Sequence, residues 1–256
     1  MISPIDFLAD LTNPDLAFLP KALLVALMSS VICGVIGSHV VLRGMAFIGE
    51  AVAHAVFPGL AVAFLLQGSL VLGGAVAGIT TAVLVAVFSQ NRRLKEDSII
   101  GIFFVAAFAL GIVIISRAPG YAAPCRTSCS SITGIPDRDV VTVAVAGALL
   151  ILGVLLLHKE LVTVSLDREM ARASGLPVFA LDLVLYVMVT IAIVISVQTI
   201  GNILVLALLI TPAATARMLT DRLGVMMTLA PCFGGLAAVV GVYLSWSLDL
   251  RPAARS

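Results

Sequence analysis

The chain has 256 residues, of which 61% are hydrophobic and only 11% are charged. Soluble domains of this size carry about 25% charged residues, so the composition excludes a water-soluble globular fold and predicts an integral membrane protein. The formal net charge of +1 gives no electrostatic basis for binding nucleic acid.

Long apolar runs divide the chain into about eight expected membrane spans. A helix needs about 20 apolar residues to cross a bilayer core of about 30 Å, and lipid cannot satisfy exposed backbone groups. We therefore predict an all-α, polytopic helical bundle that forms a single transmembrane domain over residues 1–256. The expected spans are Leu19–Leu42, Glu50–Leu66, Leu70–Phe88, Ile99–Ser116, Val140–Leu157, Phe179–Val197, Asn202–Leu219 and Gly224–Leu248.

Basic residues favour an orientation with the N-terminus outside the cell. In that orientation the cytoplasmic side receives nine of them: Arg43, Arg92, Arg93, Lys95, Lys159, Arg168, Arg172, Arg217 and Arg222. The outer side receives six: Lys21, Arg117, Arg126, Arg138, Arg251 and Arg255. Acidic residues precede the first span where a signal peptide would be basic, so we expect that span to be retained: Asp6, Asp10 and Asp15.

The stretch 158–177 is the most informative loop, and we expect it on the cytoplasmic side. Asp167 can cap a short helix, Gly175 can end it, and Pro177 prevents its simple continuation. A charged segment of this kind is typical of a solvated connector. A docking surface for a soluble partner is the alternative interpretation.

Two ionisable residues stand near the start of the second span. Glu50 and His54 are four residues apart, so they share one helical face, with Cβ atoms about 5–6 Å apart. A carboxylate and an imidazole form a partial ligand set for zinc, manganese or iron, and ionisable groups inside a span usually mark a transport path. The alternative is a hydrogen bond that ties two helices together. Two ligands are fewer than the four of a structural site, which suits a site that must release its ion.

Three further positions bear on gating. Pro58 and Gly59 follow the pair and predict a kink that would free carbonyls near the site, although such kinks are common in membrane helices. Pro212 interrupts the seventh span among small residues, which favours close helix packing and allows hinging.

Other polar residues in the spans have simpler interpretations. His39 can be a third metal ligand, but a hydrogen bond to a neighbouring helix is the favoured interpretation. His158 is expected at the interface, and Asp182 either reaches the interface or pairs with another helix. Signatures of catalysis are missing from the sequence, including the nucleotide-binding P-loop, so we expect a protein that is not itself an enzyme.

Four segments in order along the chain resemble the membrane subunits of the zinc, manganese and iron ABC importers, the ABC-3 family of metal permeases. They are Val41–Gly59, Lys95–Ile102, Ala171–Pro177 and Ala207–Ala216. The resemblance covers nearly the whole chain and favours a transport role for Glu50 and His54. Relatives commonly have Asp at position 50, and glutamate is one methylene longer.

The resemblance implies a multi-pass protein in the cytoplasmic membrane of a prokaryote, embedded in lipid. Its implied partners are a second copy or a closely related permease, two cytoplasmic ATPase subunits and an extracytoplasmic metal-binding protein. It implies no permanently bound cofactor, because the divalent manganese, zinc or iron ion is the cargo. It also implies a coupling helix, whose ATPase-facing residues would be Asp167, Arg168, Glu169, Ala171, Arg172, Ser174 and Gly175.

The stretch 122–131 departs from the family pattern. It contains Cys125 and Cys129, which could form a disulfide or a metal site in an external loop. We favour a compensated local frame error, because codons for this stretch can encode an apolar segment of the expected kind in a shifted frame. Resequencing the gene decides between them.

The predicted mechanism is alternating access, in which ATP binding by the partner subunits drives rearrangement of the spans around the ion. Two alternatives remain at this point: a self-sufficient secondary carrier that uses Glu50 for coupling, and a membrane scaffold in which Glu50 and His54 only join helices.

Overall fold

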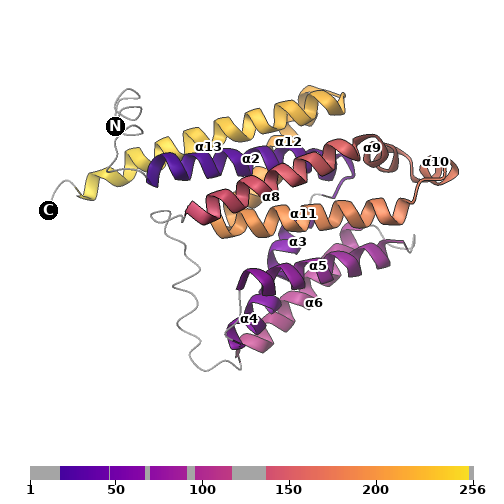
Figure 1. Ribbon diagram of the computed structural model, residues 1–256, viewed down its shortest axis with the longest axis horizontal. Coiled ribbons are helices and arrows are strands. Elements are labelled where there is room, and N and C mark those ends of the chain that lie inside the picture. Colours follow the sequence, from indigo (N-terminus) through magenta and orange to yellow (C-terminus); the bar gives the residue numbers. More distant parts are fainter. Residues whose placement is uncertain (1–17, 46, 67–69, 91–95, 117–136, 254–256) are drawn as a thin grey trace.

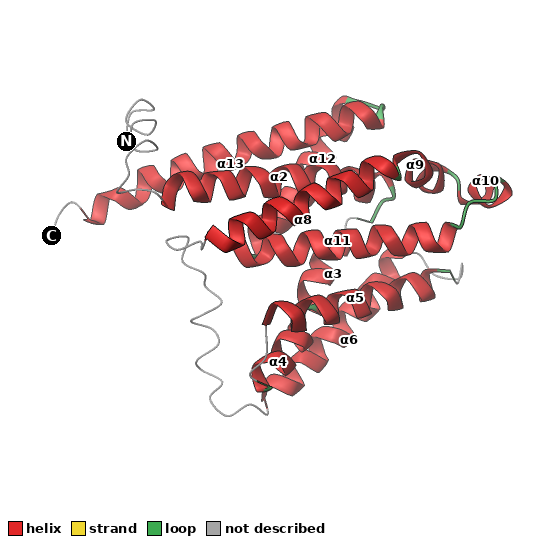
Figure 2. Cartoon of the chain, in the orientation of Figure 1, coloured by secondary structure: helices red, strands yellow, loops and turns green. Residues whose placement is uncertain are grey.

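The structure is a computed structural model that describes residues 18–45, 47–66, 70–90, 96–116 and 137–253. These residues form helices joined by short turns (Figures 1 and 2). The helices are α2 (Phe18–Leu42), α3 (Ile48–Ala55), α4 (Phe57–Leu65), α5 (Leu70–Ser89), α6 (Glu96–Ser116), α8 (Asp137–Leu156), α9 (His158–Leu166), α10 (Arg168–Ala173), α11 (Val178–Ile200), α12 (Asn202–Leu219) and α13 (Leu223–Ala253). The predicted all-α fold class is confirmed.

Each of the eight predicted spans coincides with apolar helix. Five described helices are long and apolar enough to cross a membrane, and the α8–α9 pair, bent by 64°, makes at most a sixth. The remaining two predicted spans fall on shorter apolar helices, 48–63 and 204–219. The division of the chain into apolar helices was therefore predicted correctly. Within the described ranges, five or six of them are long enough to cross a membrane.

Helix α2 lies at the centre of the bundle. It packs against α8, α11, α12 and α13, and 72% of its apolar window is buried, against 17% for α6. Figure 1 shows α2, α8, α11, α12 and α13 grouped together, with α4, α5 and α6 as a second group. Helix α3 lies between the groups and contacts α5 and α6 on one side and α11 and α12 on the other.

Small residues set how closely the helices approach. A Cβ added to Gly37 in α2 would lie 2.0 Å from the carbonyl oxygen of Leu209 in α12, so the two backbones touch there. Pro212 lies about one turn after Leu209 and is buried. Helix α12 continues past Pro212 and ends at Leu219. Helices in lipid gain little from hydrophobic burial against each other, so close van der Waals contact of this kind holds them together. The favoured interpretation of the Pro212 segment, close packing, agrees with this geometry.

The second predicted span is broken. Helix α3 ends at Ala55 and α4 begins at Phe57, with Pro58 in the first turn of α4. Proline has no backbone N–H and is best accommodated in the first turn of a helix. Gly59 follows it and touches α5, since an added Cβ would lie 2.0 Å from the carbonyl oxygen of Gly73. A kink was predicted here, and the structure has an interruption of one residue between α3 and α4. Gly59 has a packing role in addition to the hinge role that we still predict.

We expect Gly59→Ala to destabilise the protein by about 1–3 kcal/mol, because its methyl group would force α4 away from α5. The apparent melting temperature in detergent measures the effect. Gly101→Ala in α6 is the matched control, because among the described residues no heavy atom beyond the adjacent backbone of α6 lies within 4 Å of the added methyl group. Alanine is favoured over glycine inside a helix by about 0.5–1 kcal/mol, so this control should melt no lower than wild type. Equal melting of Gly59→Ala and the control would contradict the close α4–α5 contact.

Candidate functional site

Glu50 and His54 lie together on α3, as their spacing predicts. His54 Nε2 is 3.8 Å from Glu50 Oε1, which is too long for a hydrogen bond. Ligand atoms bound to one metal ion at about 2.0–2.2 Å lie about 3.0–3.5 Å apart, so a small side-chain rotation would bring the two atoms to chelating distance. Both residues belong to one helix, so the pair does not join two helices by a direct hydrogen bond.

The two side chains differ in their surroundings. The Glu50 side chain is 50% exposed, whereas that of His54 is 24% exposed. The His54 imidazole stacks on Phe57 with an angle of 16° between the rings, and its centroid lies 5.3 Å from those of Phe104 and Phe108 in α6. The imidazole is therefore held among aromatic rings beside a carboxylate that faces outward. The aromatic neighbours from α6 were not foreseen, because no sequence spacing relates residues about 50 positions apart.

The described residues supply no third ligand at this position. No group of three or more His, Cys, Asp or Glu side chains within the described ranges could hold a metal ion together. His39 is fully buried in α2, and its ring lies 5.9 Å from that of His158 in α9. Neither ring nitrogen of His39 has a hydrogen-bond partner among the described residues, so the favoured interpretation of a hydrogen-bonded His39 is not seen here. Cys125 and Cys129, for which a disulfide or a metal site was considered, lie outside the described residues.

The loop 158–177 contains two helices. Helix α9 bends away from α8 by 64°, a feature that the sequence did not indicate, and the short helix α10 follows. Asp167 caps α10 as predicted: its Oδ1 accepts hydrogen bonds from the backbone N–H groups of Glu169 at 2.8 Å and Met170 at 3.0 Å. This cap fixes the start of a helix of only six residues.

Helix α10 has its last helical residue at Ala173, and Gly175 terminates it, also as predicted. Gly175 has a φ of +78°, a left-handed conformation that favours glycine. Its N–H donates to the carbonyl of Arg172, and the N–H of Leu176 donates to that of Ala171, which is the paired pattern of a Schellman cap. Ala171 is fully buried against a small apolar cluster formed by Val164, Val178 and Leu181.

A buried ion-pair cluster lies where α2, α10 and α11 meet. Asp182 Oδ1 accepts from Arg43 Nη1 at 2.5 Å, and Asp182 Oδ2 lies 3.1 Å from Arg168 Nη2. The expectation that Asp182 pairs with another helix is confirmed. Its partners were unforeseen, because Arg43 lies 139 residues away in sequence and both arginines looked like ordinary loop charges.

The ABC 3 transport family matches residues 15–255. The chain belongs to the ABC 3 transport family. It is 39% identical over 239 residues to the manganese transport system membrane protein MntC of Halalkalibacterium halodurans, covering 93% of this chain and 82% of that protein. It is 32% identical over 232 residues to the chelated iron transport system membrane protein YfeC of Yersinia pestis, covering 91% and 79%.

Solved structures agree with this membership. The chain aligns with a structure described as PsaBC from Streptococcus pneumoniae in complex with Fab, with a TM-score of 0.80, 32% identity, and coverage of 96% of this chain and 88% of that one. As an ABC 3 transport family member, the protein is a multi-pass permease subunit of the bacterial plasma membrane and not an enzyme. These three predictions are confirmed.

We expect Asp167→Ala to loosen α10, because it removes both side-chain hydrogen bonds at the N-terminus of the helix. Loss of such a cap costs about 1 kcal/mol, which corresponds to about fivefold faster opening. Hydrogen–deuterium exchange of the amides in residues 168–173 measures it. Asp167→Asn is the control, since asparagine caps helices equally well; unchanged exchange in Asp167→Ala would show that the cap does not hold α10.

Proposed function

We propose that this permease imports a divalent transition metal ion, with manganese first and iron or zinc as alternatives, and that Glu50 and His54 are its transient ligands. The observation that carries the proposal is the pairing of the two side chains at 3.8 Å on α3. A carboxylate and an imidazole suit all three metals. The names of the relatives, manganese and chelated-iron transport membrane proteins, support manganese and iron more than zinc.

The incomplete ligand set fits a transported ion better than a stored one. Structural sites for zinc usually use four protein ligands, whereas sites that exchange their ligand keep positions open. Water molecules, or residues of a second permease, would complete the coordination here. The ion can then leave when the spans move, without the loss of four protein bonds.

We propose that the functional unit contains two permeases, either two copies of this chain or this chain with a close relative. The Glu50 side chain is half exposed on the surface of a single chain, between the exposed rings of Phe47 and Phe57. A carboxylate is costly in lipid, so this face needs a protein partner or an aqueous cavity. A second permease packed over α3 would provide both.

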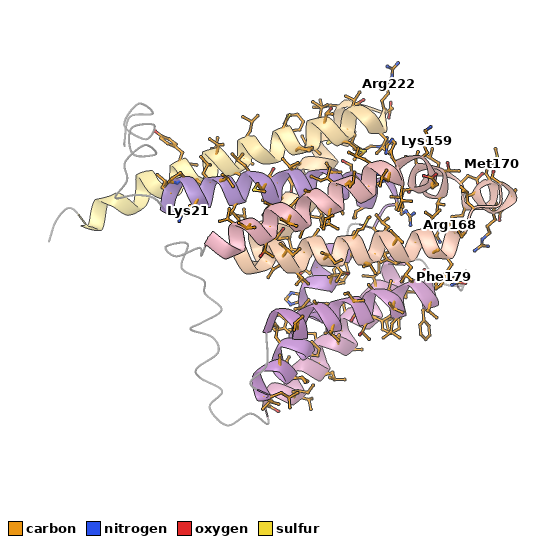
Figure 3. The ribbon with its side chains drawn as sticks, in the orientation of Figure 1. Lys21, Lys159, Arg168, Met170, Phe179 and Arg222 are labelled. Carbon is orange, nitrogen blue, oxygen red and sulfur yellow. The ribbon has the colours of Figure 1, made fainter. Side chains whose placement is uncertain are left out.

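Helix α10 is the proposed docking surface for the cytoplasmic ATPase. Figure 3 shows Met170 and Arg168 at the same end of the bundle as Lys159 and Arg222, with Lys21 at the other end. Basic residues mark the cytoplasmic end. Met170 is 63% exposed beside the charged residues of α10, which gives an apolar anchor with a polar rim, as in protein–protein interfaces. The proposed contacts remain Asp167, Arg168, Glu169, Ala171, Arg172, Ser174 and Gly175, although the buried Ala171 acts through packing.

The proposed cycle is alternating access. An extracytoplasmic metal-binding protein would deliver the ion to the outward-open pair, and ATP binding by the two ATPase subunits would act on the bundle through α10. Pro58, Gly59 and Pro212 are the proposed points of bending. No observation favours the self-sufficient secondary carrier that uses Glu50 for coupling.

We expect His54→Ala to abolish manganese uptake while leaving assembly with the ATPase intact, because the imidazole is a ligand and lies far along the chain from α10. Uptake of Mn²⁺ by cells deleted for this gene and complemented with each variant measures the first effect, and co-purification of the ATPase measures the second. Normal uptake by His54→Ala would overturn the site.

The exposed Asp221→Asn is the control for this experiment, because Asp221 has no role in the proposed path. Uptake by the purified chain in liposomes under an ion gradient, without ATPase, would instead favour the secondary carrier. Uptake of Fe²⁺ or Zn²⁺ in place of Mn²⁺ would correct the metal and leave the site intact.

A further inference from the structure

Three charged side chains form one buried cluster at the cytoplasmic end of the bundle. Asp182 uses one carboxylate oxygen for Arg43 and the other for Arg168. The side chains of Arg43 and Asp182 are only 3% and 6% exposed, and that of Arg168 is 32% exposed. Hydrogen bonds between ionised groups in such surroundings are short and strong, so the three side chains form a tight connection between their helices.

The cluster joins elements that no continuous helix connects. Arg168 is the first residue of α10, and Asp182 lies in the first turns of α11. Arg43 directly follows α2 and begins the turn that leads into α3. The single carboxylate of Asp182 therefore ties α10 to the segment between the central helix and the helix that carries Glu50 and His54.

A second contact holds Arg43 in this position. Its Nε donates to Ser165 Oγ at 2.9 Å, and Ser165 lies in α9. Ser165 in turn donates to the carbonyl of Leu161 in the same helix. Arg43 is thus bonded to α9 and α11 at once. If one of these helices moves, Arg43 must either lose its hydrogen bond to the other helix or move that helix as well.

The connection from Arg43 to the metal ligands is short. Gly44 turns the chain with a φ of +70°, and the buried Met45 precedes α3. Backbone hydrogen bonds brace this turn, since the N–H of Met45 donates to the carbonyl of Val40 at 3.1 Å. Glu50 follows within the first turn of α3. Helix α11, which carries Asp182, also packs directly against α3.

We propose that Asp182 is the positioning residue that transmits displacement of α10 to α3, so that the ion pairs with Arg168 and Arg43 couple ATP hydrolysis to movement of the metal ligands. The proposal rests on the proposed function, in which α10 receives the ATPase and α3 holds the ion. Asp182 acts through other residues and has no contact with the ion. Loss of the Asp182 carboxylate should therefore uncouple hydrolysis from transport without preventing either subunit from binding.

The test uses the complete complex, permease with its ATPase subunits, in proteoliposomes supplied with Mn²⁺ and the metal-binding protein. ATP hydrolysis and Mn²⁺ uptake are measured together. Arg168→Met removes only the α10 side of the cluster and leaves the deeper Arg43–Asp182 pair. We expect uptake per ATP hydrolysed to fall at least tenfold and Arg168→Lys to recover part of the ratio. Because Arg168 is also a proposed ATPase contact, the rate of hydrolysis itself is compared in a variant of Asp182.

Asp182→Asn separates this role from direct contact with the ATPase, because the buried Asp182 cannot reach a docked subunit. It should uncouple the complex as Arg168→Met does, while ATP hydrolysis stays within about twofold of wild type. The double variant should be no worse than Asp182→Asn alone, since both changes break one connection. Arg217→Gln, which removes an exposed ion pair with Asp221 at 4.0 Å, is the control and should keep the wild-type ratio.

Wild-type ratios in both cluster variants would overturn the proposal, as would uncoupling by Arg168→Met alone, which would assign Arg168 to the ATPase interface. Loss of ATPase co-purification in Asp182→Asn would likewise reduce the cluster to a docking role.

A second measurement keeps the proposal testable if the wild-type complex hydrolyses ATP but carries no Mn²⁺, a result that would contradict the proposed cargo. In a background without native cysteines, the rate of maleimide reaction at Glu50→Cys should change when ATP binds, and Arg168→Met should abolish that change. An ATP-dependent change that persists in Arg168→Met would overturn the coupling role whatever the cargo is.

Discussion

The bundle depends on how closely its helices can approach the central helix α2. In lipid, apolar side chains gain little by leaving their surroundings for a protein interior, so van der Waals contact and interhelical polar bonds must provide the association. Gly37 meets the backbone of Leu209, and Gly34 meets Pro231 of α13 at an added-Cβ distance of 2.7 Å. These contacts leave no room for a side chain, and they set the position of α12 and α13 relative to α2. The turn after α2 then sets where α3 begins.

Segment-level features could be predicted from the sequence because they are local. A run of apolar residues determines a span whatever lies beside it, and Asp167 with Gly175 determines the ends of α10 through bonds to the nearest residues. The break between α3 and α4 could be predicted for the same reason, since Pro58 acts on its own backbone. The 64° bend between α8 and α9 has no such local cause in the sequence, as neither proline nor glycine lies at the junction.

In the candidate site, too, the local features could be predicted from the sequence and the contacts between helices could not. The spacing of Glu50 and His54 places them on one face of any helix, and this was sufficient to find the pair. The rings of Phe104 and Phe108 around His54 depend on the packing of α6 on α3, which no periodicity reveals. The partners of Asp182 also depend on packing between helices. A carboxylate in an apolar segment predicts that a partner exists but does not identify it.

The unequal surroundings of the two proposed ligands give them different shares in ion capture. The imidazole of His54 is confined by its aromatic neighbours, so it loses little conformational freedom when an ion binds. The carboxylate of Glu50 is half exposed and therefore less confined, so ordering it at each capture would cost more side-chain entropy. For an ion bound as proposed, His54 is a ligand in a fixed position and Glu50 is a ligand that can change its position. Affinity can then be tuned through the freedom of a single glutamate, and the proposed movement of the spans has to displace only one flexible ligand to begin release.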